Sequence, residues 1–342
     1  MSWRMPAETE PHKCIWMAFP PAGSPGNETP ELLAQAHASW ALVANTISEL
    51  EPVTMLVTAG ERAAARRSLS AAVQVVEAPL DDAWMRDIGP TFVVDDQTGQ
   101  LGAVDWVFNG WGGQEWASWR HDGDVARRVA ALAGAELIAS PIVNEGGGVH
   151  VDGHGTALAT VTVQLDPGRN PTLDRRAIEA ELTRTLGVTH TVWLPRGLTR
   201  DSEELGTRGH VDMVATFTAP GRLLVHVQQH PDHPDHRVCA EILAALTDAV
   251  DANGLSFEIT ELPAPTALRD DDGWVDYSYI NHLVINDAVI ACGYDDPNDA
   301  CATEILAAAY PGREILMLDA RPILARGGGI HCITQQQPAV VR

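Results

Sequence analysis

Residues 327–332 read Gly-Gly-Gly-Ile-His-Cys, the last of five polar, mostly glycine-containing breaks that follow apolar runs of the chain. The other breaks are residues 84–90, 144–148, 209–212 and 279–281. Measured through Asp87, Glu145, His210, Asn281 and Cys332, successive breaks are 58, 65, 71 and 51 residues apart, each close to one fifth of the 342 residues. Such spacing predicts a propeller of five modules, each of which brings one loop to a central axis.

Short apolar runs with the character of strands alternate with longer segments of helical periodicity. The predicted strands are 15–19, 53–57, 73–76, 91–94, 223–227, 257–262, 284–291 and 314–318. The predicted helices are 30–50, which follows a capping-type Thr29, and 122–133, 172–186, 236–252 and 299–309. This mixed order predicts an α/β or α+β fold. No Ser-rich or charged linker divides the chain, so we expect a single domain over residues 1–342.

The chain is acidic, because 46 Asp and Glu against 23 Lys and Arg give a formal net charge of −23. This charge disfavours binding along nucleic-acid phosphates, so we expect no nucleic-acid partner. A negative field can gather a cationic small molecule, although an acidic surface that keeps a protein soluble explains the same charge. No apolar run approaches the length of a membrane span, and residues 1–30 lack the pattern of a signal peptide. We therefore expect no membrane partner and a cytoplasmic location.

Cys332 is the leading candidate for a nucleophile. It follows three glycines and His331, and a glycine-rich approach lets the backbone come close to a ligand. A buried, inert cysteine is the alternative, and we expect that of the other four cysteines. A polar, glycine-flanked setting, however, is a poor place for an apolar side chain.

Four further candidates carry ionisable side chains. His210 and Asp212 stand two residues apart, which on a strand points both to one face and offers a proton shuttle beside a fixed charge. A structural His–Asp pair is the alternative. Glu145 and Asp87 also follow apolar runs in glycine-rich surroundings, where each could instead be a turn or capping residue.

Together these candidates point to a substrate class. Carboxylates around one site repel each other unless a cation lies among them, and the planar guanidinium is the cation that carboxylates bind in a bidentate manner. A thiolate at Cys332 would attack its electron-poor central carbon. The positive substrate would also favour the thiolate form. We therefore expect a small cationic guanidine as the partner molecule.

Two histidine-rich segments resemble metal sites by their count of ligands. Residues 230–236 contain two prolines in a polar turn, so their histidines cannot share one regular face, and we expect an exposed loop. Residues 150–154 fit a turn at a strand end. The chain also lacks a glycine-rich dinucleotide fingerprint, a P-loop and a GxSxG motif. We expect no metal and no cofactor.

The ordered motifs resemble the agmatine deiminase branch of the guanidino-group-modifying superfamily, which also contains the bacterial-type peptidylarginine deiminases. The blocks that carry the resemblance are residues 5–8, 84–90, 105–113, 145–148 together with 151–153 and 155–156, 168–171, 209–212, 278–281 and 327–336. They run in order from one end of the chain to the other, and eight such motifs in register are specific where one would be weak.

The resemblance implies a five-bladed α/β propeller, the pentein fold, built from five ββαβ-like modules. It implies hydrolysis of agmatine to N-carbamoylputrescine and ammonia, a step of polyamine and putrescine synthesis, through a covalent thiouronium intermediate without metal or cofactor. By motif, Cys332 would be the nucleophile, Asp87 and Asp212 would hold the guanidinium, and Glu145 would orient His210, the acid and base. Trp84 and Trp111 would wall the substrate, with core packing as the alternative. A homo-oligomer of two or more copies is also implied.

Departures from the family pattern fall at the far end of the pocket. Gly206 stands where the family has an acidic residue that receives the amine of agmatine, and Arg208 stands in place of Asn. A cation here would favour a carboxylate, so arginine, a peptide arginine or a guanidino acid competes with agmatine as the substrate, although Glu203 or Glu204 could still reach the pocket. An amidinotransferase would need an acceptor site. An inactive binding protein is disfavoured because every expected reactive residue is present.

Overall fold

The computed structural model describes residues 2–340 and contains several small β-sheets. One sheet has the order β19-β2-β3-β4 and comprises β19 (Thr334–Pro338), β2 (His12–Ala18), β3 (Val53–Val57) and β4 (Gln74–Glu77). A second has the order β1-β5-β6-β7 and comprises β1 (Trp3–Arg4), β5 (Thr91–Asp95), β6 (Gln100–Val107) and β7 (Glu136–Val143).

The other sheets follow in chain order. The third comprises β8 (Val149–Val151), β9 (Thr156–Thr160) and β10 (His190–Leu194). The fourth comprises β11 (Ala215–Ala219), β12 (Arg222–Val227) and β13 (Glu258–Pro263). The fifth comprises β16 (Leu283–Val284), β17 (Ala288–Gly293) and β18 (Glu314–Asp319). A small separate hairpin consists of β14 (Arg269–Asp270) and β15 (Gly273–Trp274).

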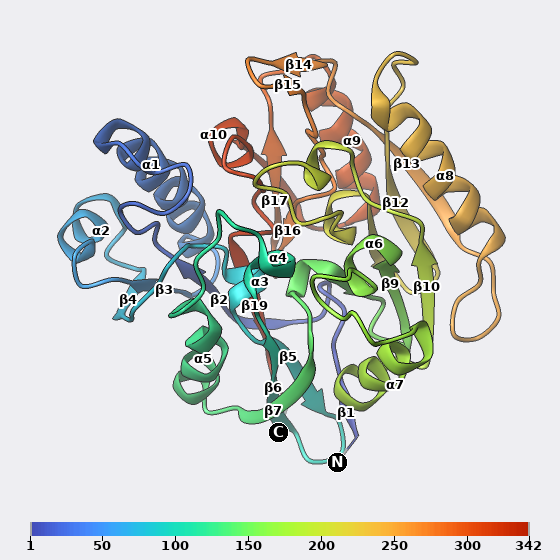
Figure 1. Ribbon diagram of the computed structural model, residues 1–342, viewed down its shortest axis with the longest axis horizontal. Coiled ribbons are helices and arrows are strands. Elements are labelled where there is room, and N and C mark those ends of the chain that lie inside the picture. Colours follow the sequence, from blue (N-terminus) through green and yellow to red (C-terminus); the bar gives the residue numbers. More distant parts are fainter. Residues whose placement is uncertain (1, 341–342) are drawn as a thin grey trace.

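One pairing pattern recurs in the five larger sheets. Each has an antiparallel pair, namely β19·β2, β5·β6, β8·β9, β11·β12 and β16·β17. The second strand of each pair then forms hydrogen bonds with a parallel strand, which the chain reaches through a helical crossover. These helices are α1 (Pro30–Ser48), α5 (Val125–Ala133), α7 (Arg175–Leu186), α8 (Pro234–Asp248) and α9 (Asn298–Ala309). In Figure 1 they follow one another around the outside of the molecule, with the strands within.

Short helical elements lie between the sheets, and several of them carry the residues of interest. They are α2 (Arg62–Ser68), α3 (Met85–Ile88), α4 (Gly110–Gly113), α6 (Val161–Gln164) and α10 (Arg321–Leu324), with the 3₁₀ turns η1 (Asp122–Asp124), η2 (Gly146–Gly148), η3 (Arg200–Ser202) and η4 (Val211–Met213). The turn η2 contacts both α3 and η4. Segments that lie far apart in the sequence therefore meet near the middle of the molecule, where Figure 1 places α3 and α4.

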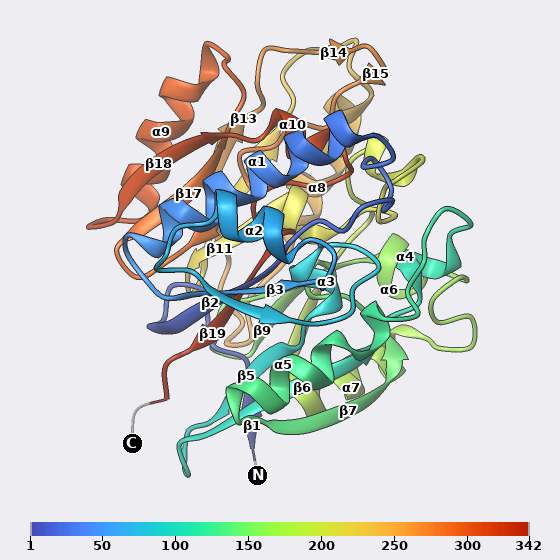
Figure 2. The same cartoon turned by 90° about the vertical axis from the view of Figure 1, so that its left-hand side faces the viewer.

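Burial on both faces explains the apolar character of the inner strands. All residues of β3 and β17 are buried, as is expected for strands that are covered on both sides. Helix α1 contributes Trp40, Val43 and Ile47, each at most 1% exposed, to the main core. Figure 2 shows α1 and α2 in front of β3, which α1 contacts.

Most expected elements are confirmed, and the differences have local causes. Thr29 does cap α1, since its hydroxyl accepts a hydrogen bond from the Leu32 backbone N–H at 3.2 Å. The single strand predicted over residues 284–291 is wrong, because a tight turn divides it into β16 and β17, and the backbone N–H of Ile285 donates to Ala288 O. A residue far away in the sequence holds the backbone of this turn, because the backbone N–H of Asn286 donates to Glu51 Oε2 at 2.9 Å.

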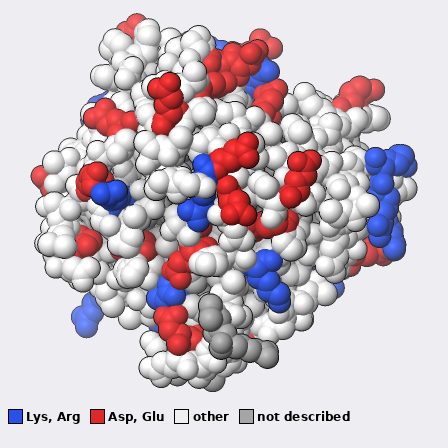
Figure 3. Space-filling model, turned by 180° about the vertical axis from the view of Figure 1, so that it is seen from behind, with Lys and Arg blue, Asp and Glu red and all other residues white. Residues whose placement is uncertain are grey.

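The surface carries charge of both signs. On the face shown in Figure 3, acidic and basic side chains are interspersed over a largely uncharged surface. Within residues 2–340, no helix has both the length and the apolar character needed to cross a bilayer. Cys301 is exposed, so the expectation that the four other cysteines are buried is wrong for this one.

We expect Leu56→Ala in β3 to lower the free energy of unfolding by about 2 to 5 kcal/mol, because Leu56 is 0% exposed and its loss leaves a cavity. The same substitution at Leu255, which is 64% exposed, should change stability by less than about 0.5 kcal/mol. Urea unfolding followed by circular dichroism measures both. Equal effects of the two substitutions would contradict the assignment of this strand to the core.

Candidate active site

The Cys332 side chain lies at the meeting point of several loops and is 5% exposed. Its Sγ lies 3.7 Å from Asp212 Oδ2 and 3.2 Å from the amide nitrogen Nδ2 of Asn281. The backbone carbonyl of Cys332 accepts a hydrogen bond from the backbone N–H of Arg86 at 3.0 Å, which fixes α3 against the cysteine loop. The structure thus brings together residues from four of the five breaks.

His210 lies between two carboxylates and is 1% exposed. Its Nε2 is 3.2 Å from Glu145 Oε2, and its Nδ1 is 3.8 Å from Asp87 Oδ1. That Nδ1 is buried and has no hydrogen-bond partner among residues 2–340. The imidazole is therefore oriented through one nitrogen and leaves the other for a ligand.

Asp87 and Asp212 use their oxygens differently. Trp111 Nε1 donates to Asp87 Oδ2 at 2.9 Å, and the backbone N–H of Gly147 donates to Oδ1 at 3.2 Å. Asp212 Oδ2 is bound to His331 Nδ1 at 2.7 Å. Asp212 Oδ1 is buried without a partner in the described chain, so one carboxylate oxygen is available beside the thiol.

The two candidate tryptophans hold different positions. Trp111 adopts a left-handed backbone conformation with φ of 54°, a costly conformation for a bulky residue, and this places its indole N–H on Asp87. Trp84 is 7% exposed and packs edge-on against Trp40, with ring centroids 5.6 Å apart. A Cβ atom on Gly328 would lie 2.6 Å from the Trp84 ring and 3.1 Å from Cys332 Sγ, so only glycine lets the ring and the thiol come this close.

Burial and charge set the protonation states of the acid–base pair. Burial, together with the negative charges of Asp212 and Asp87, raises the pKa of the Cys332 thiol well above its usual value. Burial alone would lower the pKa of His210, but Asp87 and Glu145 outweigh it and raise that pKa to about 9. The site without substrate therefore holds a neutral thiol and a positively charged imidazolium at neutral pH.

The carboxylates respond to their surroundings in opposite ways. Burial and the charges of Glu145 and Asp212 raise the pKa of Asp87 to about 6. Burial would also raise the pKa of Glu145, but the charge of Arg169 and the contact with His210 lower it. Asp212 likewise has a lowered pKa, because His331 overcomes the effect of burial.

Several supporting residues were not predicted from the sequence. Arg169 Nε contacts both oxygens of Glu145 at 3.0 Å, and Arg169 Nη2 donates to Thr207 O at 2.7 Å. Asp201 Oδ2 accepts hydrogen bonds from the His210 backbone N–H at 2.9 Å and from the Thr207 hydroxyl at 2.7 Å. Arg169 does lie in one of the recurring motif blocks, and a buried arginine beside Glu145 is the partner that this carboxylate requires.

A cleft of about 610 Å³ opens beside this cluster. Its wall includes residues 21–26 with Glu28, Asp81, Trp116, Glu204 and Leu205. Trp116 stacks on Trp111, with ring centroids 5.3 Å apart. The Trp116 ring therefore lies between the cleft and Trp111, whose indole N–H binds Asp87. Glu204, an expected substrate-end residue, thus lies on the wall of the cleft.

Gly206 is tightly packed against neighbouring backbone, whereas Arg208 lies at the surface. A Cβ atom at Gly206 would lie 2.1 Å from the carbonyl oxygen of Asp201, so this backbone leaves no room for an acidic side chain there. Arg208 is exposed and has a φ of 76°, and its Nη1 lies 3.5 Å from the carbonyl oxygen of Ser202. Its guanidinium therefore rests against its own loop.

Comparison with known proteins decides the family. The family model of Porphyromonas-type peptidyl-arginine deiminases matches residues 4–338. The chain belongs to this family. A relative from Streptomyces coelicolor is 53% identical over 99% of both chains, and the agmatine deiminase of Stutzerimonas stutzeri is 39% identical over 98% of this chain and 95% of its own.

A solved structure supports the same family assignment. The agmatine deiminase of Enterococcus faecalis superposes with a TM-score of 0.91 at 32% identity, covering 99% of this chain and 97% of that one. This member of the deiminase family thus has the single-domain α/β fold of the agmatine deiminases, the pentein fold.

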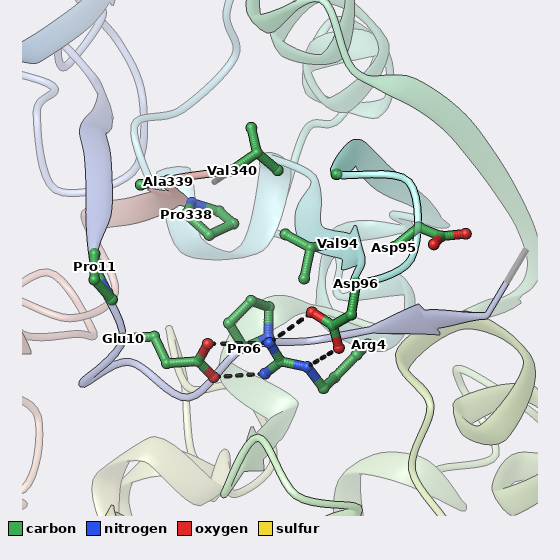
Figure 4. Close-up of a pocket in the computed structure, with 11 residues that line it drawn as sticks. Arg4, Pro6, Glu10, Pro11, Val94, Asp95, Asp96, Pro338, Ala339 and Val340 are labelled. Carbon is green, nitrogen blue, oxygen red and sulfur yellow. Dashed lines mark hydrogen bonds and ion pairs between the residues drawn. The ribbon is translucent and has the colours of Figure 1, made fainter. Parts of the chain in front are cut away.

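A second cavity lies away from the cluster and contains an arginine whose charge is paired with carboxylates. It measures about 210 Å³ and is lined by the N-terminal segment, the β5–β6 turn and residues 338–340 (Figure 4). Within it, Arg4 binds Asp96 through Nε at 2.7 Å and Glu10 through Nη2 at 3.1 Å. The guanidinium charge is thus paired on both sides.

The histidine-rich segments serve structural roles in this deiminase family member. His233, which is 3% exposed, caps α8 by accepting the Asp235 backbone N–H at Nδ1, and its Nε2 contacts Val275 O. The loop expected over 230–236 is therefore only partly exposed, and α8 already begins at Pro234. His150 contacts Thr216 through Nε2 and accepts from the Phe217 backbone N–H through Nδ1.

We expect Asp87→Asn to change the pH dependence of stability. The pKa of Asp87 is raised from about 3.9 in an unfolded chain to about 6, so the native carboxyl loses stability as pH rises through that window. The Asn variant has no carboxyl to ionise, so its stability does not fall in this way as the pH rises. Relative to the wild type, it should gain about 2 to 3 kcal/mol between pH 4 and pH 7 in urea unfolding.

Asp212→Asn is the matched control, because the pKa of Asp212 is lowered and its carboxylate contributes stability above its unfolded pKa. Relative to the wild type, this variant should lose stability as the pH rises from 3 to 7. If both differences stayed constant across the pH range, the electrostatic description of the two carboxylates would be wrong.

Proposed function

We propose that this chain is an agmatine deiminase, a hydrolase that converts the guanidinium of agmatine to a ureido group and releases ammonia, giving N-carbamoylputrescine. The observation that carries the proposal is a pair of buried atoms in the cluster around Cys332, Asp212 Oδ1 and His210 Nδ1, which have no hydrogen-bond partner among residues 2–340. One can accept a guanidinium N–H, and the other can exchange a proton with the reacting nitrogen.

In this mechanism, Asp87 and Asp212 hold the substrate guanidinium through its N–H donors. The planar cation replaces their mutual repulsion with two charge-assisted contacts. Such contacts are strong here because the site is buried from solvent. We assign Trp84 and Trp111 to packing against the rest of the substrate.

Substrate binding also activates the nucleophile. The raised thiol pKa of Cys332 arises from burial and from the carboxylates of Asp212 and Asp87. A guanidinium between those carboxylates offsets both charges, so the thiol releases its proton to solvent as substrate binds. The thiolate then attacks the central carbon and forms a C–S bond.

His210 acts first as an acid and then as a base. Its imidazolium protonates one substrate nitrogen, and the C–N bond breaks to release ammonia and leave a thiouronium on Cys332. The neutral imidazole takes a proton from water, whose oxygen attacks the same carbon. The C–S bond then breaks, which returns the thiolate and the ureido product. Glu145, held by Arg169, orients the ring throughout.

The wider cleft suits a substrate with a second cation. Glu204 and Asp81 lie on its wall, and Trp116 offers an aromatic face for an aliphatic chain. Arg208 points to solvent beside Ser202, which weakens the case for a carboxylate-bearing guanidine such as arginine or a C-terminal arginine. We therefore assign the amine end of agmatine to Glu204.

We also propose that the five repeated sheets form the blades of a five-bladed propeller, so that residues 1–342 form one guanidine-deiminase domain of five ββαβ modules. Residues 1 and 341–342 lie outside the described part of the chain. The shared pairing order of the sheets supports this arrangement. We further propose a homo-oligomer that works in the cytoplasm, where its free cysteines would stay reduced.

Steady-state assays with agmatine, arginine and a peptide ending in arginine test the function. We expect agmatine to give the highest kcat/KM and to yield ammonia and a ureido product in equal amounts, since one C–N bond breaks per turnover. Preference for a carboxylate-bearing substrate would reassign the far end of the pocket. Transfer of the amidino group to an added amine would indicate an amidinotransferase.

The nucleophile is tested by Cys332→Ala, which we expect to lower kcat by at least about 10⁴-fold because no covalent intermediate can form. The matched control is Cys301→Ala, since Cys301 is exposed and distant from the thiol in the chain, and it should keep full turnover. Full turnover by Cys332→Ala would falsify the covalent mechanism.

We expect Glu204→Gln to raise the KM for agmatine about 3- to 10-fold with little change in kcat, because it removes one exposed charge that contacts the substrate amine. Glu203→Gln, an exposed neighbour, is the control and should leave KM unchanged. Equal KM values for all three proteins would exclude Glu204 from substrate binding.

A further inference from the structure

His331 lies behind the nucleophile and is 3% exposed. Its Nδ1 is 2.7 Å from Asp212 Oδ2, and its Nε2 is 2.6 Å from Glu8 Oε1. Both ring nitrogens therefore make short contacts with carboxylates, and the two carboxylates lie 204 residues apart in the sequence. The side chain follows three glycines and directly precedes Cys332, so its ring and the thiol belong to one loop.

Two such contacts constrain the protonation of the ring. A neutral imidazole has one N–H donor and one lone pair, so it could satisfy only one of the two carboxylates and would direct its lone pair at the other. An imidazolium donates from both nitrogens. The geometry thus fits a positive His331 between Asp212 and Glu8.

The other groups around His331 are consistent with that state. Arg86 Nη1 lies 3.4 Å from Glu8 Oε1 and donates to Gln336 Oε1 at 2.7 Å. Glu8 therefore forms ion pairs with both Arg86 and His331. His150 stands 6.5 Å away between ring centroids. Burial, before any other cause, lowers the pKa of His150 and of the nearby His282 to about 4, so neither adds charge at neutral pH.

The protonation of His331 is itself supported by its partners. Burial and Arg86 lower its pKa, but Glu8 and Asp212 more than offset them, and the pKa is raised overall. The same contact also affects Asp212. Burial would raise the pKa of Asp212, but His331, more than any other group, lowers it below its usual value. The Asp212 carboxylate is ionised because the imidazolium is there.

We propose that His331 is a positioning residue, an imidazolium clamped by Glu8 that keeps Asp212 ionised and aimed, with Oδ1 free for the substrate guanidinium. This inference rests on the proposed function, because it assigns a role toward the same substrate. It extends the site to the N-terminal segment through Glu8 and Arg86. Neither His331 nor Glu8 contacts the reacting atoms in this scheme.

A measurement on the unmodified protein tests the clamp first. Nitrogen-15 NMR of histidine-labelled protein, with His331 assigned through the backbone, reports which ring nitrogens carry protons. We expect both His331 nitrogens to be protonated at pH 7 and at pH 8. A single protonated nitrogen at pH 7 would overturn the proposal.

Agmatine binding tests the consequence. Glu8→Gln keeps the size of the side chain but removes the charge that stabilises the imidazolium, so we expect the pKa of Asp212 to rise. In a Cys332→Ala background, calorimetry should show the Kd for agmatine about 10-fold or more higher at pH 6, with a smaller difference at pH 8.5. A role confined to folding would not produce this pH dependence.

Glu51→Gln is the matched control, because Glu51 is also a buried carboxylate beside a histidine, 3.8 Å from His12, and contacts none of the proposed catalytic residues. Its Kd should equal that of the background at every pH. A Kd within twofold of the background for Glu8→Gln at all pH values would refute the clamp. If the wild type did not turn over agmatine, the proposed function would fail, and the NMR result would still decide the state of His331.

Discussion

The buried carboxylates around Cys332 impose the constraint on which the rest of the site depends. Glu8, Asp87, Glu145 and Asp212 are all at most 6% exposed, and ionised carboxylates so far from water are tolerated only beside cations. Arg169 compensates Glu145, while His331 lies between Asp212 and Glu8. Among the described residues, His210 is the only cation that contacts Asp87, and their nearest atoms are 3.8 Å apart, too far for a hydrogen bond. The charge of Asp87 is therefore only weakly balanced at the place where a cationic substrate would sit.

This imbalance connects binding with chemistry. A site that was fully neutralised would bind a guanidinium weakly, whereas a site with unpaired carboxylates would be unstable and would keep Cys332 protonated. In the proposed mechanism, the substrate supplies the missing positive charge and thereby favours the thiolate. The stability lost through Asp87 is thus linked directly to recognition of the substrate.

Sequence patterns predicted the site residues where function requires a recognisable local composition. Cys332, His210, Asp87, Asp212 and Glu145 all lie in glycine-containing breaks, because backbone that approaches a ligand closely needs small residues. The compensating groups were harder to find, since Glu8 meets His331 across 323 residues of chain, and no periodicity links residues so far apart. The hairpin of β16 and β17 was missed because its apolar residues continue on both sides of a two-residue polar turn. Arg208 was assigned to the pocket by its place in the chain, while its positive φ turns it toward Ser202.

The pairing of β19 with β2 bears on how the protein is synthesised. Cys332 lies two residues before β19, so a nascent chain acquires its nucleophile and the partner of β2 at almost the same moment. Until then, one edge of β2 is unpaired, and the carboxylates of the first three breaks have no thiol among them. A chain released early by the ribosome would lack both the cysteine and the strand that completes the first sheet. Translation of residues 332–338 thus supplies both the nucleophile and the strand that pairs with β2.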